Sequence, residues 1–225
     1  MLSSKYYPAL RELVKAADLT NQIYLRQVWS QNEKLDKILR EENACSGSVY
    51  QYFKLNSGPW SRLDDDRRFV NHTGDVPEIK PAGSNFYPEG MTRASFATWV
   101  EKNPSLKQNA TSMYTVIRAG ASADSYTIVP YSAEYADLLN AVTLHLNNAI
   151  ASLTEAQDES VKNYLRALIS DMKTNNYKSS NEAFLKVDEE PLLRVQLGPY
   201  GVKEDTLLGL KNSFVGYIAV MDKTA

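Results

Sequence analysis

The chain has 225 residues, enough for one large domain or two small ones, and its 43% hydrophobic and 23% charged residues are typical of a globular protein. A net charge of −2 provides no basic surface of the kind that nucleic acids require, so we expect no nucleic-acid partner. One cysteine, Cys45, excludes an internal disulfide and cannot build a zinc cage alone. We interpret it as a spectator thiol.

The sequence also lacks targeting signals. No apolar run is long enough to cross a membrane, so we expect no membrane span. The opening residues MLSSKYYPALREL lack the cationic segment and apolar segment of a secretory signal. If Met1 is the natural start, the sequence predicts a cytoplasmic protein.

Residues 1–45 are predicted to be helical. Apolar residues follow one helical face from Pro8 to Trp29, and a proline suits the first turn of a helix. The sequence SQNE, residues 30–33, has the pattern of a capping box, in which Ser30 caps and Glu33 reaches back. A second helix is therefore expected to begin there.

Residues 46–130 are predicted to be rich in loops and strands. VYQYFKLN, residues 49–56, alternates as a strand does. Residues 71–91 are rich in proline and glycine, and so long an irregular segment is usually packed and functional, or else mobile. Two further elements are expected here, a short helix in TRASFATWVEKN and a hairpin that pairs YTVIR with YTIVP.

Residues 131–187 carry the clearest helical pattern. Apolar residues step at three and four positions in a helix that Ser132 is predicted to cap, and again in a helix from Val161 to Met172. Ser179 and Glu182 have the spacing of another capping box.

Residues 188–225 are predicted to be strand-rich. LLRVQL reads as a strand that ends at Gly198-Pro199, and the apolar run 214–221 fits either a strand or a helix. The whole pattern predicts an α+β fold, mostly α-helical with a small antiparallel sheet or partial barrel, in a single lobe spanning residues 1–225.

Several stretches, taken in chain order, resemble one family. They are similar to the amino-terminal half of bacterial dipeptidyl-peptidase III-like zinc peptidases, and the similarity runs from about residue 10 to about residue 220. The stretches that carry it are AADLTNQIYLRQVW, YFKLNSGPWSRLDDDRRF, KPAGSNFYPEGMT, YTIVPYSAEYADLL and QLGPYGVKED.

The resemblance implies a two-lobed enzyme that removes dipeptides from the amino end of peptides. Its zinc ligands lie on a helix with the sequence H-E-x-x-G-H, whose glutamate polarises the attacking water. This chain does not contain that motif. Its two histidines lie far apart, and we interpret His72 as a solvated loop residue and His145 as a helix residue beside an apolar stripe.

The turn QLGPYGVKED departs from the family at two positions. The resemblance implies a glutamate and a tyrosine there, an acid for the peptide's ammonium group and a phenol for the developing oxyanion. This chain has Gly201 and Lys203 instead. Glycine supplies no anion and lysine repels an ammonium group, although a lysine is itself able to stabilise an oxyanion. The turn is therefore kept, whereas the peptidase contacts are not.

Two functions from different classes follow. The first is a non-catalytic protein, a pseudoenzyme without catalytic or metal-binding residues, that binds a peptide or protein or serves as an assembly subunit. The second is the amino-terminal fragment of an active zinc-dependent dipeptidyl-peptidase, in which zinc is expected only with a carboxy-terminal half outside this chain. A hydrolase that uses Cys45 has little support.

A lobe without its second lobe would expose an apolar face, so we expect self-association or a protein partner to cover it. The candidate binding residues are Trp60, Asn85, Phe86, Tyr87, Tyr200 and Lys203. The alternative is that the aromatic side chains pin long loops to the core and that Lys203 is a solvated turn cation. LDDDRR, residues 63–68, is interpreted as a solvated charge cluster rather than a cation site, because its acids lack the spacing of a calcium loop.

Overall fold

The computed structural model describes residues 3–42, 47–70, 76–122, 125–188 and 191–221. Cys45 and His72 lie outside these residues, so the interpretations of both stay predictions. No helix in the described ranges is both long and apolar enough to cross a membrane.

The chain forms two compact units, each built from segments that are distant in sequence. Unit 1 comprises Met1–Ile23, Pro130–Tyr200 and Phe214–Ala225, and unit 2 comprises Tyr24–Val129 and Gly201–Ser213. The helix α1 (Tyr7–Val28) begins in unit 1 and ends in unit 2. The prediction that residues 1–225 together correspond to a single lobe stays a prediction.

The helices of unit 1 follow the sequence pattern closely. Besides α1, they are α6 (Tyr131–Glu134), α7 (Ala136–Ser152), α8 (Glu159–Thr174) and α9 (Lys178–Phe184). Most of the apolar positions that predicted them are buried, with Leu13, Val142 and Leu168 each fully shielded from solvent, whereas Val14 of α1 is 46% exposed. The predicted helices of this region are confirmed.

The predictions that Ser132 and Ser179 cap helices are both wrong. Side chains from α8 and from its carboxyl end make the hydrogen bonds instead. The Ser132 N–H donates to Asn175 Oδ1 at 2.8 Å, and Ser132 lies inside α6. Ser179 lies inside α9, where its hydroxyl and the Ser180 N–H both donate to the buried carboxylate of Asp171. A carboxylate from a neighbouring helix thus satisfies the amino end of α9.

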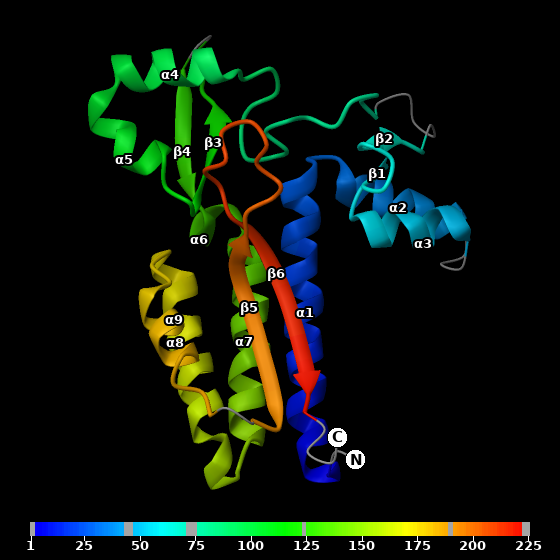
Figure 1. The fold of residues 1–225 in the computed structure, drawn as a ribbon, viewed down its shortest axis with the longest axis vertical. Coiled ribbons are helices and arrows are strands. Elements are labelled where there is room, and N and C mark those ends of the chain that lie inside the picture. The colour runs from blue at the N-terminus through cyan, green and yellow to red at the C-terminus, as the bar shows by residue number, and fades with distance from the viewer. Residues whose placement is uncertain (1–2, 43–46, 71–75, 123–124, 189–190, 222–225) are drawn as a thin grey trace. The chain divides into compact units, whose positions relative to one another are not determined.

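Strands β5 (Leu193–Gly201) and β6 (Ser213–Val220) form a two-stranded ribbon that runs alongside α7 and the unit 1 part of α1 (Figure 1). Leu193, Val195 and Leu197 alternate into the core as a half-buried strand requires. β5 continues through Gly198-Pro199, so the prediction that it ends there is wrong. The undecided run 214–221 is a strand.

An aromatic cluster fills one end of unit 1. The Phe214 ring of β6 lies 5.9 Å from the Tyr131 ring and 6.1 Å from the Tyr135 ring. Tyr164 and Phe184 form a second edge-to-face pair at 5.4 Å. Such pairs add specific geometry to the burial of large apolar surfaces.

The first part of unit 2 packs around an apolar core under α2 (Asn32–Glu42) and α3 (Ser48–Asn56). α3 overturns the strand predicted for residues 49–56. Tyr50 and Phe53 are buried at a spacing of three, which is helical, and the helix ends where Ser57 adopts the left-handed conformation with φ 53°. The alternation was a coincidence of residue types.

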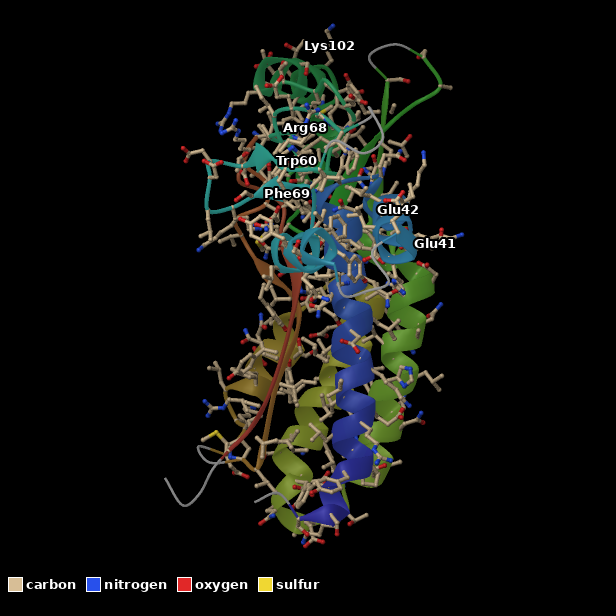
Figure 2. The ribbon with its side chains drawn as sticks, turned by 90° about the vertical axis from the view of Figure 1, so that its right-hand side faces the viewer. Glu41, Glu42, Trp60, Arg68, Phe69 and Lys102 are labelled. Atoms are coloured by element: carbon tan, nitrogen blue, oxygen red, sulfur yellow. The ribbon has the colours of Figure 1, made fainter. Side chains whose placement is uncertain are left out.

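A short strand pair follows, β1 (Trp60–Ser61) with β2 (Arg67–Arg68). Trp60 is opposite Arg68 in this antiparallel ladder, and Figure 2 labels both side chains. The Trp60 ring meets the Trp29 ring edge-on at 5.4 Å, which ties the strand pair to the end of α1.

The remainder of unit 2 confirms the predicted short helix and hairpin, as α4 (Arg93–Lys102) and as β3 (Thr115–Ala119) paired with β4 (Tyr126–Pro130). Thr92 and Ser95 form a capping box before α4, and α5 (Lys107–Ala110) leads into β3. The fold is α+β and mostly helical, as predicted. The described strands form three separate two-stranded pairs.

Candidate functional site

The segment between β5 and β6, residues 201–213, is held within unit 2 by two adjacent carboxylates. Glu204 and Asp205 are 2% and 3% exposed, although they lie in a loop. Buried carboxylates are rare unless they are paired, so each must have strong partners.

Glu204 gathers three segments of unit 2. Its Oε1 accepts the hydroxyl of Tyr24 at 2.5 Å and an ion pair with Arg62 Nη2 at 2.7 Å, and its Oε2 pairs with Lys80 Nζ at 2.9 Å. Burial alone raises the pKa of Glu204, but the charge of Lys80, the Tyr24 hydrogen bond and the charge of Arg62 outweigh burial and lower it. Glu204 is therefore an ionised anchor.

Asp205 accepts hydrogen bonds from later residues of the same loop. Its Oδ2 accepts the Tyr87 hydroxyl at 2.7 Å and the backbone N–H groups of Leu210 and Lys211 at 2.8 and 3.0 Å, while its Oδ1 accepts the Leu208 N–H at 2.9 Å. One carboxylate thus satisfies three backbone donors and a phenol. Burial, together with Asp205, raises the pKa of Tyr87, which stays a neutral donor.

Lys211 is a buried cation at the end of the same segment, 1% exposed. Its Nζ donates to the carbonyl oxygens of Ala110 and Ser112 at 2.7 and 2.8 Å and to Thr115 Oγ1 at 2.9 Å. Burial lowers the pKa of Lys211 to about 7, and the charge of Asp205 opposes this shift. The ammonium group ties the segment to the start of β3.

Three of the predicted binding residues are buried aromatic side chains. Trp60, Phe86 and Tyr87 are 2%, 0% and 4% exposed. Trp60 Nε1 donates to the carbonyl of Pro77 at 3.0 Å. In this structure these residues pin irregular segments to the core, which is the alternative stated above, and a binding role for them stays a prediction.

Asn85 is half-buried and also holds a loop in place. Its Nδ2 donates to the Arg26 carbonyl at 2.8 Å and its N–H donates to the Gln27 carbonyl at 2.9 Å, so the loop attaches to the end of α1. Its own carbonyl accepts from Arg118 at 2.9 Å. Residues 85–87 therefore form one continuous stretch with a structural role, which contacts the segment 201–213 through the hydrogen bond from Tyr87 to Asp205.

Tyr200 and Lys203 fall in different units, Tyr200 in unit 1 and Lys203 in unit 2. Tyr200 packs edge-on against Tyr177 at 6.3 Å, and Gly198, at φ +144°, leaves room for the Tyr200 ring, which lies 2.8 Å from where a Cβ would be. Lys203 is exposed, as is Val202 at 67%. The turn therefore presents Val202 and Lys203.

The sequence pattern did not identify Glu204 and Asp205 as structural centres. Nothing in the local pattern marks them, because two acids in a turn are ordinarily solvated. Their partners lie at distant positions in the chain: Tyr24, Arg62, Lys80 and Tyr87.

The acidic turn at residues 63–68 is largely solvated, with the Asp64 and Arg67 side chains 63% and 80% exposed and 3.9 Å apart. Among the residues that the structure describes, no group of three or more His, Cys, Asp or Glu side chains is placed to hold a metal ion.

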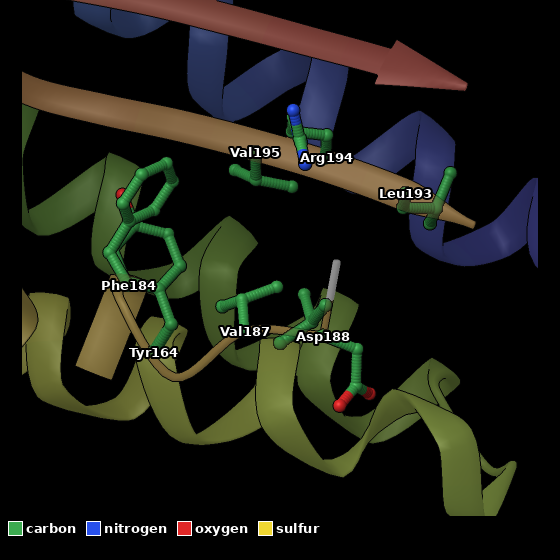
Figure 3. Close-up of a pocket in the computed structure, with 8 residues that line it drawn as sticks. Tyr164, Phe184, Val187, Asp188, Leu193, Arg194 and Val195 are labelled. Carbon is green, nitrogen blue, oxygen red and sulfur yellow. The ribbon is translucent and has the colours of Figure 1, made fainter. Parts of the chain in front are cut away.

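A pocket of about 140 Å³ lies within unit 1, and none of the predicted site residues lines it. Figure 3 shows Val195 of β5 facing Val187 across it. The lining is mostly apolar and comprises Val161, Tyr164, Phe184, Val187, Asp188, Leu193, Arg194 and Val195.

The fold is similar to that of dipeptidyl-peptidase III, which confirms the resemblance seen in the sequence. One solved structure, dipeptidyl-peptidase III from Corallococcus sp. strain EGB, is 32% identical with a TM-score of 0.86 and matches 99% of this chain. Another, from Caldithrix abyssi, is 29% identical with a TM-score of 0.84 and also matches 99% of this chain. This chain spans only 40% and 41% of those two chains.

A curated protein is also similar. Nudix hydrolase 3 of Arabidopsis thaliana is 27% identical over 271 residues, an alignment that covers 100% of this chain and 34% of the plant protein. No family model matches the chain.

Proposed function

We propose that the chain is a non-catalytic module with the fold of one lobe of dipeptidyl-peptidase III, and that it binds a peptide or protein or serves as an assembly subunit. The observation that supports this most directly is the segment 201–213. Its anchors Glu204 and Asp205 are intact and buried, yet its exposed tip carries Lys203 beside Gly201.

The balance of retained and replaced groups favours binding over cleavage. An anchored loop is a suitable platform for recognition, because its tip pays little ordering entropy when a ligand binds. The ammonium group of Lys203 disfavours the free amino end of a peptide and favours a carboxylate. The module's ligand is therefore proposed to be an acidic or carboxylate-bearing segment of a peptide or protein.

The comparisons support a modular role in a second way. The same stretch is similar to two-fifths of proteins described as dipeptidyl-peptidase III and to one-third of a protein described as a Nudix hydrolase. A region similar to parts of proteins that are named for different activities is suited to the role of a building block.

The test combines a peptidase assay with a binding assay. Purified protein, with and without added zinc, is incubated with a fluorogenic dipeptide substrate, and fluorescence polarisation measures its binding to labelled acidic and basic peptides. We expect no dipeptide release and tighter binding of the acidic peptides. Lys203→Glu should reverse that preference, with Lys102→Glu, exposed on α4 in the same unit, as the control. Turnover dependent on zinc would refute the proposal.

The alternative is that the chain is the amino-terminal fragment of an active zinc-dependent dipeptidyl-peptidase. The 40–41% coverage of the solved structures favours this reading. The gene sequence that follows the codon for Ala225 discriminates between the two. An H-E-x-x-G-H motif in the same reading frame supports the fragment, and a stop codon supports the module.

A further inference from the structure

The ion cluster around Glu204 carries more positive than negative charge. Glu204 pairs with two cations, Arg62 through Oε1 at 2.7 Å and Lys80 through Oε2 at 2.9 Å. Its third partner, Tyr24, adds no charge, because burial and the charge of Glu204 raise the pKa of the Tyr24 hydroxyl. Two positive charges and one negative charge therefore leave the cluster with a net charge of +1.

This excess charge is largely withdrawn from water. The side chains of Glu204 and Lys80 are 2% and 11% exposed, whereas that of Arg62 is 36% exposed and reaches the surface. Charges in such a place are weakly screened, so an unbalanced one costs free energy unless a counter-ion joins it. Asp66 also attracts Arg62, but Asp66 is partly exposed and water screens its charge.

The two cations retain hydrogen-bond donors for a counter-ion. Arg62 Nε donates to the Asn56 carbonyl at 3.1 Å, and Arg62 Nη2 donates to the Tyr24 hydroxyl at 2.7 Å. Within the part of the chain that the structure describes, Arg62 Nη1 has no acceptor, and Glu204 Oε2 is the only acceptor of Lys80 Nζ. A guanidinium group has five N–H donors and an ammonium group has three, so both groups have donors to spare.

We propose that Arg62 and Lys80 bind one carboxylate group of the ligand, which neutralises the cluster around Glu204. A carboxylate carries one negative charge and matches the excess, whereas a phosphate monoester carries about 1.5 to 2 at neutral pH. The planar guanidinium of Arg62 presents paired N–H groups that suit the two oxygens of a carboxylate. This inference rests on the proposed function, to which it adds a second contact for the acidic ligand besides Lys203.

The first test uses three labelled peptides in the fluorescence polarisation assay. One has a glutamate and an amidated end, one has a free carboxyl end and no acidic residue, and one is neutral and amidated. We expect the neutral peptide to bind most weakly. The tighter of the other two identifies the source of the carboxylate, a side chain or a chain end.

Arg62→Gln should weaken the binding of the tighter peptide by about tenfold or more, because it removes both the excess charge and the paired donors. Arg67→Gln is the matched control. Arg67 lies in the same turn with its side chain 80% exposed, and its loss should leave the affinity unchanged.

Glu204→Gln separates ligand binding from a merely structural role. Glutamine keeps the shape of the side chain and an oxygen for the Tyr24 hydroxyl, but it raises the net charge of the cluster from +1 to +2. If the cluster binds a carboxylate, this variant should bind the peptide about threefold more tightly or better, even where its stability is lower. Thermal unfolding checks that each variant is folded at the assay temperature.

A direct measurement needs no peptide. The Nε–H signal of Arg62 in a ¹⁵N-labelled sample, identified by its loss in Arg62→Gln, should shift saturably as sodium acetate is added. Sodium chloride at the same ionic strength is the control and should cause no saturable shift. The signal of Arg67 should respond alike to both salts.

Three results would overturn the inference: an Arg62→Gln variant that binds like the wild type, a folded Glu204→Gln variant that binds no more tightly, or an Arg62 signal that is indifferent to acetate. Acidic peptides that bind but are weakened only by Lys203→Ala would refute the carboxylate site and leave the proposed function standing. An Arg62 signal that acetate saturates, with no acidic peptide bound, would support the site and refute the peptide-binding role.

Discussion

The segment 201–213 and the β5–β6 ribbon are neighbours in sequence, but they are stabilised by different physics. The segment is held by buried charges, with Glu204, Asp205 and Lys211 each meeting several partners. The ribbon is held by apolar side chains such as Leu197 and Phe214, which are 0% and 1% exposed. The first arrangement requires distant groups to converge, whereas the second requires only that one face be apolar.

The largest expected effect is in the charged segment. Asp205→Ala leaves three backbone N–H groups, one of them buried, and the buried Tyr87 hydroxyl without their acceptor, so we expect a loss of about 4 kcal/mol in the free energy of unfolding. Urea unfolding followed by circular dichroism measures it. Asp64→Ala, with an exposed side chain, is the control and should change stability by less than about 0.5 kcal/mol. Equal losses in the two variants would contradict the role assigned to Asp205.

The ribbon should respond to a cavity rather than to a lost charge. Leu197→Ala removes a fully buried side chain, for which we expect a loss of about 3 kcal/mol. The loss should not vary with pH, since no titratable group is removed. Parallel urea titrations at pH 6 and pH 9 check this, and a pH-dependent loss would show that the two regions are coupled.

Lys211→Met tests the contrast between the charged segment and the apolar ribbon through the pH dependence of the free energy of unfolding. The pKa of Lys211 is about 7 in the folded chain, below the unfolded value of roughly 10.4. Between these values the unfolded state binds more protons, so the contribution of Lys211 to stability rises with pH and is flat below about pH 7. We expect a loss of about 2 kcal/mol at pH 7 from the three carbonyl and hydroxyl acceptors left unsatisfied.

The measurement for Lys211 is the stability difference between wild type and Lys211→Met, by urea unfolding from pH 6 to pH 10. The difference should grow in favour of the wild type above pH 7. A difference that shrinks as pH rises would mean that the folded pKa lies above the unfolded one.

The smallest expected effect on stability is at the exposed tip. Lys203→Ala should change the free energy of unfolding by less than about 0.5 kcal/mol, because the Lys203 side chain is exposed. It should still weaken the binding of acidic peptides, measured by fluorescence polarisation. A loss of stability without a change in binding would place Lys203 in the scaffold instead.

The helices could be predicted because their evidence is local. The apolar stripes of α1, α7 and α8 repeat at three and four residues, and this period identifies a helix wherever it is long. Residues 49–56 were mistaken for a strand because eight residues are too few to separate the two periods. The caps at Ser132 and Ser179 failed for another reason, since Asn175 and Asp171 compete from elsewhere in the chain.

The candidate site divides in the same way. The turn that contains Gly201 and Lys203 could be recognised from the amino-acid sequence alone, because motif and spacing are properties of the sequence. The sequence did not determine that Trp60, Phe86 and Tyr87 are buried. An aromatic residue in a loop is equally suited to contact a ligand and to pack in the core. The choice depends on what the loop packs against.

By itself, the sequence determined the helical periods, the β5 strand, the likeness to dipeptidyl-peptidase III and the two replaced positions in the turn. Only the tertiary structure decided that Glu204, Asp205 and Lys211 are buried, and that β5 pairs with β6. The physical reason is the range of the interactions. Periodicity and turn chemistry act over a few residues, whereas a buried charge or a strand pair depends on groups that meet only after the chain has folded.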